Sequence, residues 1–263
     1  MKIFDTHAHY DDERYIEDLD KVIKDNYEKG VKKIVNASYD LESSRKSKVL
    51  ADKYDSIYFA VGIHPEGVRK SIDEDINELR KIIDKNKENK KLVAIGEIGL
   101  DYYYTKENKA LQKEYFIKQL DLAIENDLPV IIHSRDASQD MYEILKHNKY
   151  EKIKLVFHCF QPSDEIAKLI LERKYMVGVG GNITFKRSEH SLNIISSIPV
   201  EQIMVETDAP YMSPVPVRGT RNESKNIKYV IEKLSEIKNI EADELQEILY
   251  SNSIKFFNIN EKS

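Results

Sequence analysis

Short apolar runs rich in β-branched residues alternate with amphipathic segments along the whole chain. The amphipathic segments, such as 73–86 and 107–127, place apolar residues at i, i+3, i+4 and i+7, which is the spacing of one helix face. Strands are predicted for the eight apolar runs, at residues 2–7, 32–38, 56–64, 91–99, 128–134, 153–160, 175–181 and 202–208.

This alternation predicts the α/β class. Strands that are apolar throughout need cover on both faces, and connecting helices supply it when the sheet is parallel. Eight strand–helix units in 263 residues fit a (β/α)8 TIM barrel that forms a single domain over residues 1–263. A doubly wound sheet is the main alternative. In a barrel of this kind the active site is expected at the carboxyl ends of the strands.

The composition narrows the class of protein further. The formal net charge of −5 argues against a broad basic face that coats duplex nucleic acid, although bound divalent cations would still make a cleft positive. No apolar run is long enough to span a bilayer, and no basic-then-apolar leader begins the chain, so no membrane association is expected. A single cysteine, Cys159, fits a reducing compartment. We predict a cytoplasmic protein, and no obligate protein partner is evident.

Side chains that can bind metals follow six of the predicted strands. They are His7 and His9, His64, Glu97, His133, His158 and Asp208. A single histidine at a strand end is more often a hydrogen-bonding residue than a metal ligand. A barrel, however, would bring all of these side chains to one rim, and so many independent coincidences are not expected.

Six of these residues form a mixed nitrogen and oxygen ligand set. They are His7, His9, Glu97, His133, His158 and Asp208. The set suits zinc or manganese and also admits magnesium. Because it exceeds the needs of one tetrahedral ion, we predict two divalent ions bridged by Glu97, an arrangement used in phosphoester hydrolysis by a metal-bound hydroxide. Glu97 and Asp208 are the predicted catalytic residues, with Asp208 accepting a proton from the attacking water.

Several motifs occur together and in order. They are "DTHAH", "GIHP", "GEIGLDYY", "IIHSRDA", "HCF", "ETDAPY" and "RGTRNE". Over essentially the whole chain, this set resembles the TatD family of metal-dependent hydrolases, within the amidohydrolase-like superfamily. The resemblance implies a cytoplasmic deoxyribonuclease with two divalent metals that acts on DNA ends, often 3′ to 5′ on single strands. It implies that His7, His9, Glu97 and Asp208 bind one metal, and that Glu97, His133 and His158 bind the other.

Two motifs depart from the usual pattern of that family. The family commonly reads G-x-H-P-H, whereas "GIHPEG" places Glu66 after the proline. The family commonly reads H-C-F-S-G, whereas "HCFQPS" carries Gln161 and Pro162. Both changes fall on predicted rim loops, so they concern substrate contacts and leave the six metal ligands intact.

Four residues are predicted to contact substrate: His64, Arg135, Arg218 and Arg221. Arg135 could bind a phosphate with two hydrogen bonds, or pair with a loop acid such as Asp136. Arg218 and Arg221 lie after the eighth strand, where barrels often bind phosphate. The alternative for these two is loop closure through ion pairs with Glu206 or Glu223. Structural hydrogen bonding is the alternative for His64.

Further polar and aromatic residues flank the predicted ligands. Asp5 lies two residues before His7 on the same strand face and is expected to orient an imidazole. Glu206 shares the facing of Asp208 and is expected either to support a ligand or to fill the barrel. At least two of the tyrosines at 102–104 are expected to pack on the barrel rim, which leaves base stacking open for the other.

The sequence therefore predicts a divalent-metal-dependent deoxyribonuclease whose substrate is the end of single-stranded DNA. An alternative on the same metal centre is ester or amide hydrolysis, such as deacylation of D-aminoacyl-tRNA, to which related TatD proteins have been linked. A third alternative is a non-catalytic metal-binding barrel that acts through a partner, and it predicts retained function after Asp208→Asn.

Overall fold

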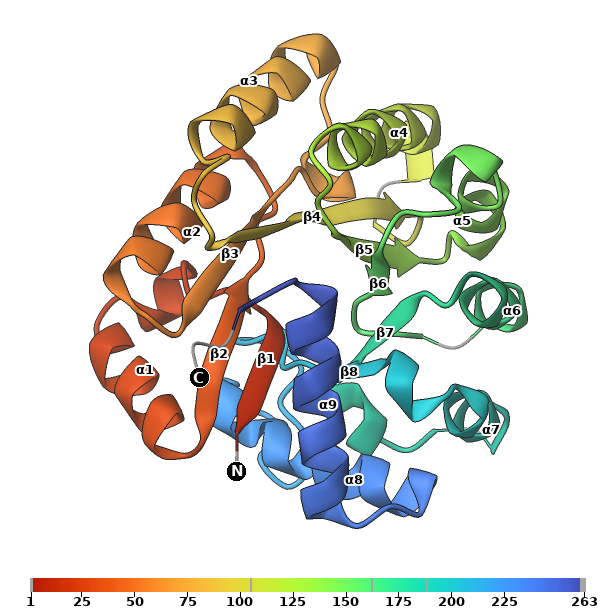
Figure 1. Cartoon of the computed structure of the whole chain (residues 1–263). Helices are drawn as coiled ribbons and strands as arrows, with labels where there is room; N and C mark the ends of the chain where they lie inside the picture. The colour runs from red at the N-terminus through yellow and green to blue at the C-terminus, as the bar shows by residue number, and fades with distance from the viewer. Residues whose placement is uncertain (1, 105, 162, 188, 261–263) are drawn as a thin grey trace.

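Eight parallel strands form a barrel in the computed structural model of the chain (Figure 1). The structure describes residues 2–104, 106–161, 163–187 and 189–260. The strands are β1 (Ile3–Ala8), β2 (Val31–Asn36), β3 (Ile57–Val61), β4 (Leu92–Asp101), β5 (Val130–Arg135), β6 (Leu155–Phe157), β7 (Met176–Val179) and β8 (Ile203–Val205). They pair in chain order, and a parallel bridge between Ala8 and Ala209 brings the first and last strands together. The predicted TIM barrel is confirmed, and the doubly wound alternative is wrong.

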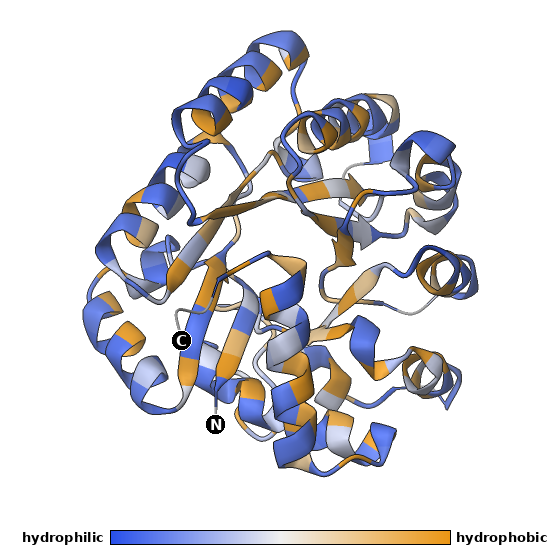
Figure 2. Ribbon diagram, in the orientation of Figure 1, coloured by the Kyte–Doolittle hydropathy of each residue, from blue (hydrophilic) through white to orange (hydrophobic). Residues whose placement is uncertain are grey.

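Helices surround the barrel and present apolar stripes to it, with charged residues outward (Figure 2). They are α1 (Leu19–Glu28), α2 (Leu41–Lys53), α3 (Ile72–Lys85), α4 (Lys109–Glu125), α5 (Ser138–Leu145), α6 (Asp164–Arg173), α7 (Glu189–Ser197), α8 (Ile227–Lys238) and α9 (Ala242–Phe256). Helix α3 shows the pattern, because Ile72, Ile76, Leu79 and Ile83 are buried on one face. No helix in the described part of the chain is long and apolar enough to cross a membrane.

The amino-terminal end of the barrel is closed by apolar side chains from the end of the chain. Phe4, near the start of β1, lies 6.3 Å from the ring of Tyr250 in α9 and 5.7 Å from the ring of Phe257, measured between ring centroids. Helix α9 lies against β1 and β8 (Figure 1). With this end filled, the polar residues of the strands gather at the opposite, carboxyl end.

A β-bulge in β4 determines the position of Glu97. The pairing of β4 with β5 shifts by one residue between Ile95 and Ile98, and Glu97 lies inside this irregular stretch. Bulges re-aim the side chains that they carry. The close approach of the two strands also requires Gly99, which has a φ of 151°, because a Cβ there would lie 1.9 Å from a backbone oxygen of β5.

Candidate metal centre and active site

All six predicted metal ligands meet at the carboxyl end of the barrel. They come from β1 and the residues after it (His7, His9), β4 (Glu97), β5 (His133), and the segments that follow β6 (His158) and β8 (Asp208). Together with His64, their ligand atoms form three groups, each with all atoms within 4.8 Å of one another. The groups are His7, Glu97 and His158; His7, His9 and Asp208; and His64, Glu97 and His133.

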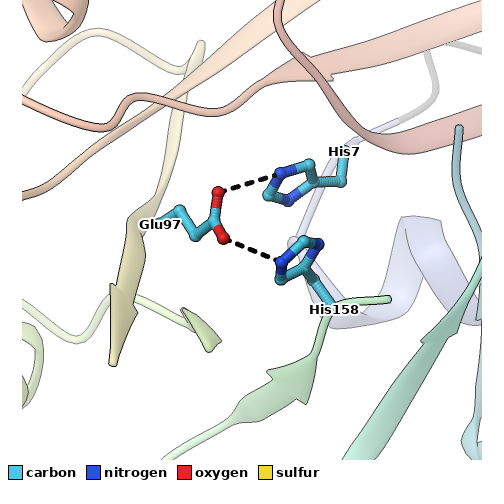
Figure 3. Close-up of side chains that lie close together, drawn as sticks. All are labelled: His7, Glu97 and His158. Carbon is cyan, nitrogen blue, oxygen red and sulfur yellow. Dashed lines mark ion pairs between the residues drawn. The ribbon is translucent and has the colours of Figure 1, made fainter. Parts of the chain in front are cut away.

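Glu97 lies at the centre of these side chains. Its Oε2 is 3.3 Å from Nε2 of His7, and its Oε1 is 2.7 Å from Nε2 of His158 (Figure 3). Oε1 is also 2.8 Å from Nδ1 of His133 and 3.5 Å from Nε2 of His64. The two carboxylate oxygens therefore face different imidazoles, which is the arrangement that a bridging ligand requires.

His9 and Asp208 complete the other side of the cluster. Nε2 of His7 lies 3.1 Å from Nε2 of His9, so both imidazoles direct the same ring nitrogen to one point. Oδ1 of Asp208 lies 3.7 Å from Nε2 of His7 and 3.4 Å from Nε2 of His9. Asp208 has a φ of 56°, a left-handed backbone conformation that a non-glycine residue adopts at an energetic cost.

Groups outside the cluster hold the other ring nitrogens of two histidines, His9 and His133. Nδ1 of His9 donates to the Ala37 carbonyl at 3.0 Å, which leaves Nε2 free of a proton when the ring is neutral. Nε2 of His133 donates to Oδ2 of Asp101 at 2.9 Å and leaves Nδ1 for a metal. The corresponding atom of His158, Nδ1, lies 3.5 Å from Oε1 of Glu206. The buried Nδ1 atoms of His7 and His158 have no hydrogen-bond partner among the described residues.

The contact between Asp101 and His133 is absent from the sequence-based predictions. Asp101 is fully buried at the end of β4. It lies four residues after Glu97 in the motif "GEIGLDYY", and this even spacing was the available signal, because alternate residues of a strand share a face. His64, which we expected to contact substrate, lies close enough to Glu97 and His133 to act as a ligand as well.

The position of Asp5 corrects one expectation. Its carboxylate accepts hydrogen bonds from the backbone N–H of His7 (3.3 Å), from the N–H and hydroxyl of Thr207 (3.0 and 2.6 Å) and from the hydroxyl of Ser224 (2.6 Å). None of these donors is an imidazole, so the expected contact with a ring is not formed. Complete burial raises the pKa of Asp5 to about 7. Asp5 instead ties β1 to the segment that carries Asp208.

Charges in the cluster shift one another's pKa. Burial acts to lower the pKa of His9, but Asp208 and Glu97 raise it to about 9. Burial acts to raise the pKa of Glu97, yet His158 and the other nearby imidazoles hold it well below its usual range. The carboxylates are therefore ionised, and they hold protons on imidazoles that a divalent cation would displace.

This donor set fits a pair of divalent cations. Imidazole nitrogens and carboxylate oxygens are the ligands that zinc, manganese and related ions take. The ligand atoms converge from several strands, and partners on the second ring nitrogen fix the tautomer of His9 and His133 for ligation. His7, His9 and Asp208 would hold one ion, His133 and His158 the other, and Glu97 both. These roles stay predictions.

A cleft of about 610 Å³ opens above the cluster. His64 and Arg135, two of the predicted substrate contacts, line it, and so does Glu66 from the altered motif. The altered residue Pro162 lies outside the described residues.

Two other predicted substrate contacts, Arg218 and Arg221, do not line this cleft. The guanidinium of Arg218 stacks 4.3 Å from the ring centroid of Phe185. Arg221 pairs with Asp18 at 2.7 Å and with Glu223 at 3.2 Å. Arg221 therefore makes the loop-closing ion pair that was the alternative to a phosphate contact.

The chain matches known proteins along nearly its whole length. The model of the family described as "TatD related DNase" matches residues 4–258. An uncharacterized metal-dependent hydrolase of Bacillus subtilis, YabD, is 37% identical over 258 residues, which cover 98% of this chain and 100% of that protein. An uncharacterized metal-dependent hydrolase of Methanocaldococcus jannaschii, MJ1582, is 34% identical, with 98% and 97% covered.

Solved structures show the same relationship. The crystal structure of YjjV, a TatD homologue from Escherichia coli, superimposes with a TM-score of 0.89 at 30% identity, and 98% of each chain is covered. A TatD family hydrolase from Entamoeba histolytica superimposes with a TM-score of 0.86 at 27% identity, again with 98% of each chain covered. The chain therefore belongs to the TatD family of metal-dependent hydrolases.

Proposed function

We propose that this hydrolase is a deoxyribonuclease that removes nucleotides from the 3′ end of single-stranded DNA. The observation that carries the proposal is the convergence of four histidines and two carboxylates on one point, with Glu97 between two sets of imidazoles. Two adjacent divalent ions are suited to phosphoester hydrolysis, because they contact both the attacking and the leaving oxygen. The description of the matching family as TatD related DNase supports the same reaction.

The metals and the side chains have separate tasks in this reaction. When bound, the two cations supply the positive charge that activates water and offsets charge on the phosphoryl group. Asp208 accepts the proton that the attacking water loses. Burial acts to raise the pKa of Asp208, but hydrogen bonding to His9 and the charge of neighbouring imidazoles lower it, so the carboxylate is ionised at neutral pH.

Residues on the cleft wall bind and orient the substrate. Arg135 carries the positive charge that binds a phosphate. His64 lines the cleft together with Glu97, and its Nδ1 accepts from the N–H of Glu66 at 3.2 Å. Its Nε2 lies 3.5 Å from Oε1 of Glu97, where it would contact either a phosphoryl oxygen or a bound metal.

Hydrolysis of an aminoacyl ester is the second candidate. Three carboxylates, those of Asp12, Asp40 and Glu66, line the cleft, and they would attract the α-ammonium group of such a substrate. The same metal centre serves either reaction, since both proceed by attack of water on an electrophilic centre. A D-aminoacyl-tRNA is the substrate that represents this candidate.

An end-labelled oligonucleotide digestion tests the proposal. Single-stranded and duplex DNA and single-stranded RNA are incubated with magnesium, manganese or zinc, and a D-aminoacyl-tRNA is assayed in parallel. A ladder that shortens from the 3′ end of single-stranded DNA, and that is lost in Glu97→Ala and Asp208→Asn, is the expected result. Cleavage of the aminoacyl ester alone would replace the proposal with the second candidate, and full nuclease activity in Glu97→Ala would refute it.

A further inference from the structure

One wall of the cleft carries an arginine stacked on two tyrosines. The guanidinium carbon of Arg135 lies 4.0 Å from the ring centroid of Tyr103 and 4.8 Å from that of Tyr104. The two rings meet edge to face, with centroids 4.8 Å apart. We call these three residues the Arg135 platform. Arg135 and Tyr104 line the cleft directly.

The platform is tied to the metal centre through Asp101. Oδ1 of Asp101 accepts hydrogen bonds from the backbone N–H groups of Tyr103 and Tyr104, both at 2.9 Å. Oδ2 of the same carboxylate accepts from His133, a predicted metal ligand. Arg135 is paired with Asp101 in the register of β4 and β5. The buried carboxylate of Asp101 therefore holds both the backbone of the two tyrosines and the ring of His133. Because β4 and β5 carry these residues, the sheet sets the distance between the Arg135 platform and the predicted metal ligand His133.

The platform is open to a ligand. Tyr103 and Tyr104 are 53% and 60% exposed, whereas Tyr102 is 5% exposed. Of these tyrosines only Tyr102 is buried on the rim, whereas Tyr103 and Tyr104 pack against Arg135 and each other and stay more than half exposed. No carboxylate of the described residues forms an ion pair with Arg135, and stacking holds its guanidinium without using all its N–H donors.

The charges of the cleft limit how much of a polyanion can enter. Arg135 is the only arginine or lysine among the described residues that line it. Asp40 and Glu66 line it as well and would repel further phosphates, whereas the charge of Asp12, which also lines the cleft, is offset by its two bonds to Arg14. Binding in the cleft thus depends on one cation and on aromatic faces, in addition to the metals.

We propose that the Arg135 platform is the subsite for the terminal nucleotide of a single strand. The base stacks on Tyr104, and the Arg135 guanidinium binds the adjacent phosphate. This inference rests on the proposed nuclease function. Every base offers a π-face, so the subsite accepts any sequence, while a base held in a duplex cannot reach the tyrosine. Only about one phosphate is neutralised by the protein, so binding depends weakly on salt, with a slope of about −0.7 in log–log form.

Fluorescence of a short oligonucleotide with 2-aminopurine at its 3′ end tests the subsite. A terminal phosphorothioate linkage slows cleavage, and stacking on tyrosine is read as quenching of the base. In Tyr104→Leu the quenching is expected to be lost and Kd to rise roughly 5- to 150-fold, the range for loss of one base–aromatic stack. Tyr104→Phe keeps the ring and is expected to bind as the wild type does.

Tyr27→Leu is the matched control, because Tyr27 is 52% exposed near the end of α1, which leads to the start of β2 and so lies away from the cleft. Metal content and melting temperature of each variant establish that the site and fold are intact. Unchanged quenching and Kd in Tyr104→Leu, or a salt slope steeper than about −3, would overturn the subsite. If the wild type cleaves no nucleic acid, the proposed function fails instead, so the two failures are distinguishable.

Discussion

Asp101→Asn is expected to weaken metal binding without unfolding the barrel. The two side chains have nearly the same shape, and the Oδ1 of asparagine can still accept from the N–H groups of Tyr103 and Tyr104. The amide NH₂ then faces Nε2 of His133, where the wild type has a carboxylate oxygen at 2.9 Å. Nε2 must become an acceptor, so the ring proton moves to Nδ1. This is the atom that lies 2.8 Å from Oε1 of Glu97 and that we predict to bind the metal.

The expected decrease in metal affinity follows from the loss of one correctly oriented ligand. Removing a carboxylate that supports a metal-bound histidine costs about 10- to 100-fold in metal affinity, or about 1.4–2.8 kcal/mol. Asp101 is fully buried, so water cannot replace its contact with the ring. We therefore expect a loss in the upper part of this range for the ion bound by His133.

Competition with a chromophoric chelator measures this affinity in metal-stripped protein. Asp12→Asn is the control, because it removes a carboxylate charge from the same cleft without touching an imidazole; Asp12 is bonded to Arg14 instead. An affinity in Asp101→Asn equal to that of the wild type would refute the reasoning. An equal loss in both variants would also do so, since it would point to net charge and not to the tautomer of His133.

Three further predictions follow from single contacts. Gly99→Ala should lower the free energy of unfolding by about 3 kcal/mol or more in urea titrations, because the new Cβ would lie 1.9 Å from a backbone oxygen of β5. Gly67→Ala is the control. Its Cβ would have a nearest contact of 3.6 Å, so it should change the free energy of unfolding by less than about 1 kcal/mol. The pKa of Asp75 is lowered chiefly by hydrogen bonds from Arg69, so Asp75 should stabilise the fold at a pH above its ordinary pKa and lose this contribution as pH falls through the lower pKa of the folded state. The free energy of unfolding of Asp75→Asn should therefore depend less on pH in the acid range. An unchanged pH dependence would contradict the pairing. Because the pKa of His9 is about 9 without metal, metal binding at neutral pH should release a proton and become tighter as pH rises toward 9. Calorimetry in buffers of different ionisation enthalpy measures the released proton. A binding enthalpy that does not depend on the buffer would contradict this prediction.

The convergence of the six predicted ligands was predictable from the sequence because it follows from strand periodicity. Each ligand stands at or just past the end of an apolar run, and parallel strands of a barrel bring such positions to one rim. His7 and His9 share a face because they are two residues apart. Knowledge of loop conformation was not needed for this step.

Neither the contacts between distant segments nor the exposure of side chains in loops could be predicted in the same way. Asp5 accepts hydrogen bonds from Thr207 and Ser224, which lie more than 200 residues away, and no local sequence pattern indicates these partners. The exposure of Tyr103 and Tyr104 follows from the turn that Asp101 caps. Side-chain direction in a tight turn depends on such contacts and not on hydrophobic pattern.

The number of divalent ions that each chain binds shows whether Glu97 bridges a pair of metals. Metal-stripped protein is loaded with zinc or manganese, freed of excess, and analysed by elemental mass spectrometry beside Glu97→Gln. We predict two divalent ions per chain in the wild type, and fewer in the variant because Glu97 contacts the predicted ligands of both ions. Fewer than one ion per chain in fully loaded wild type, or two ions retained by Glu97→Gln, would contradict it.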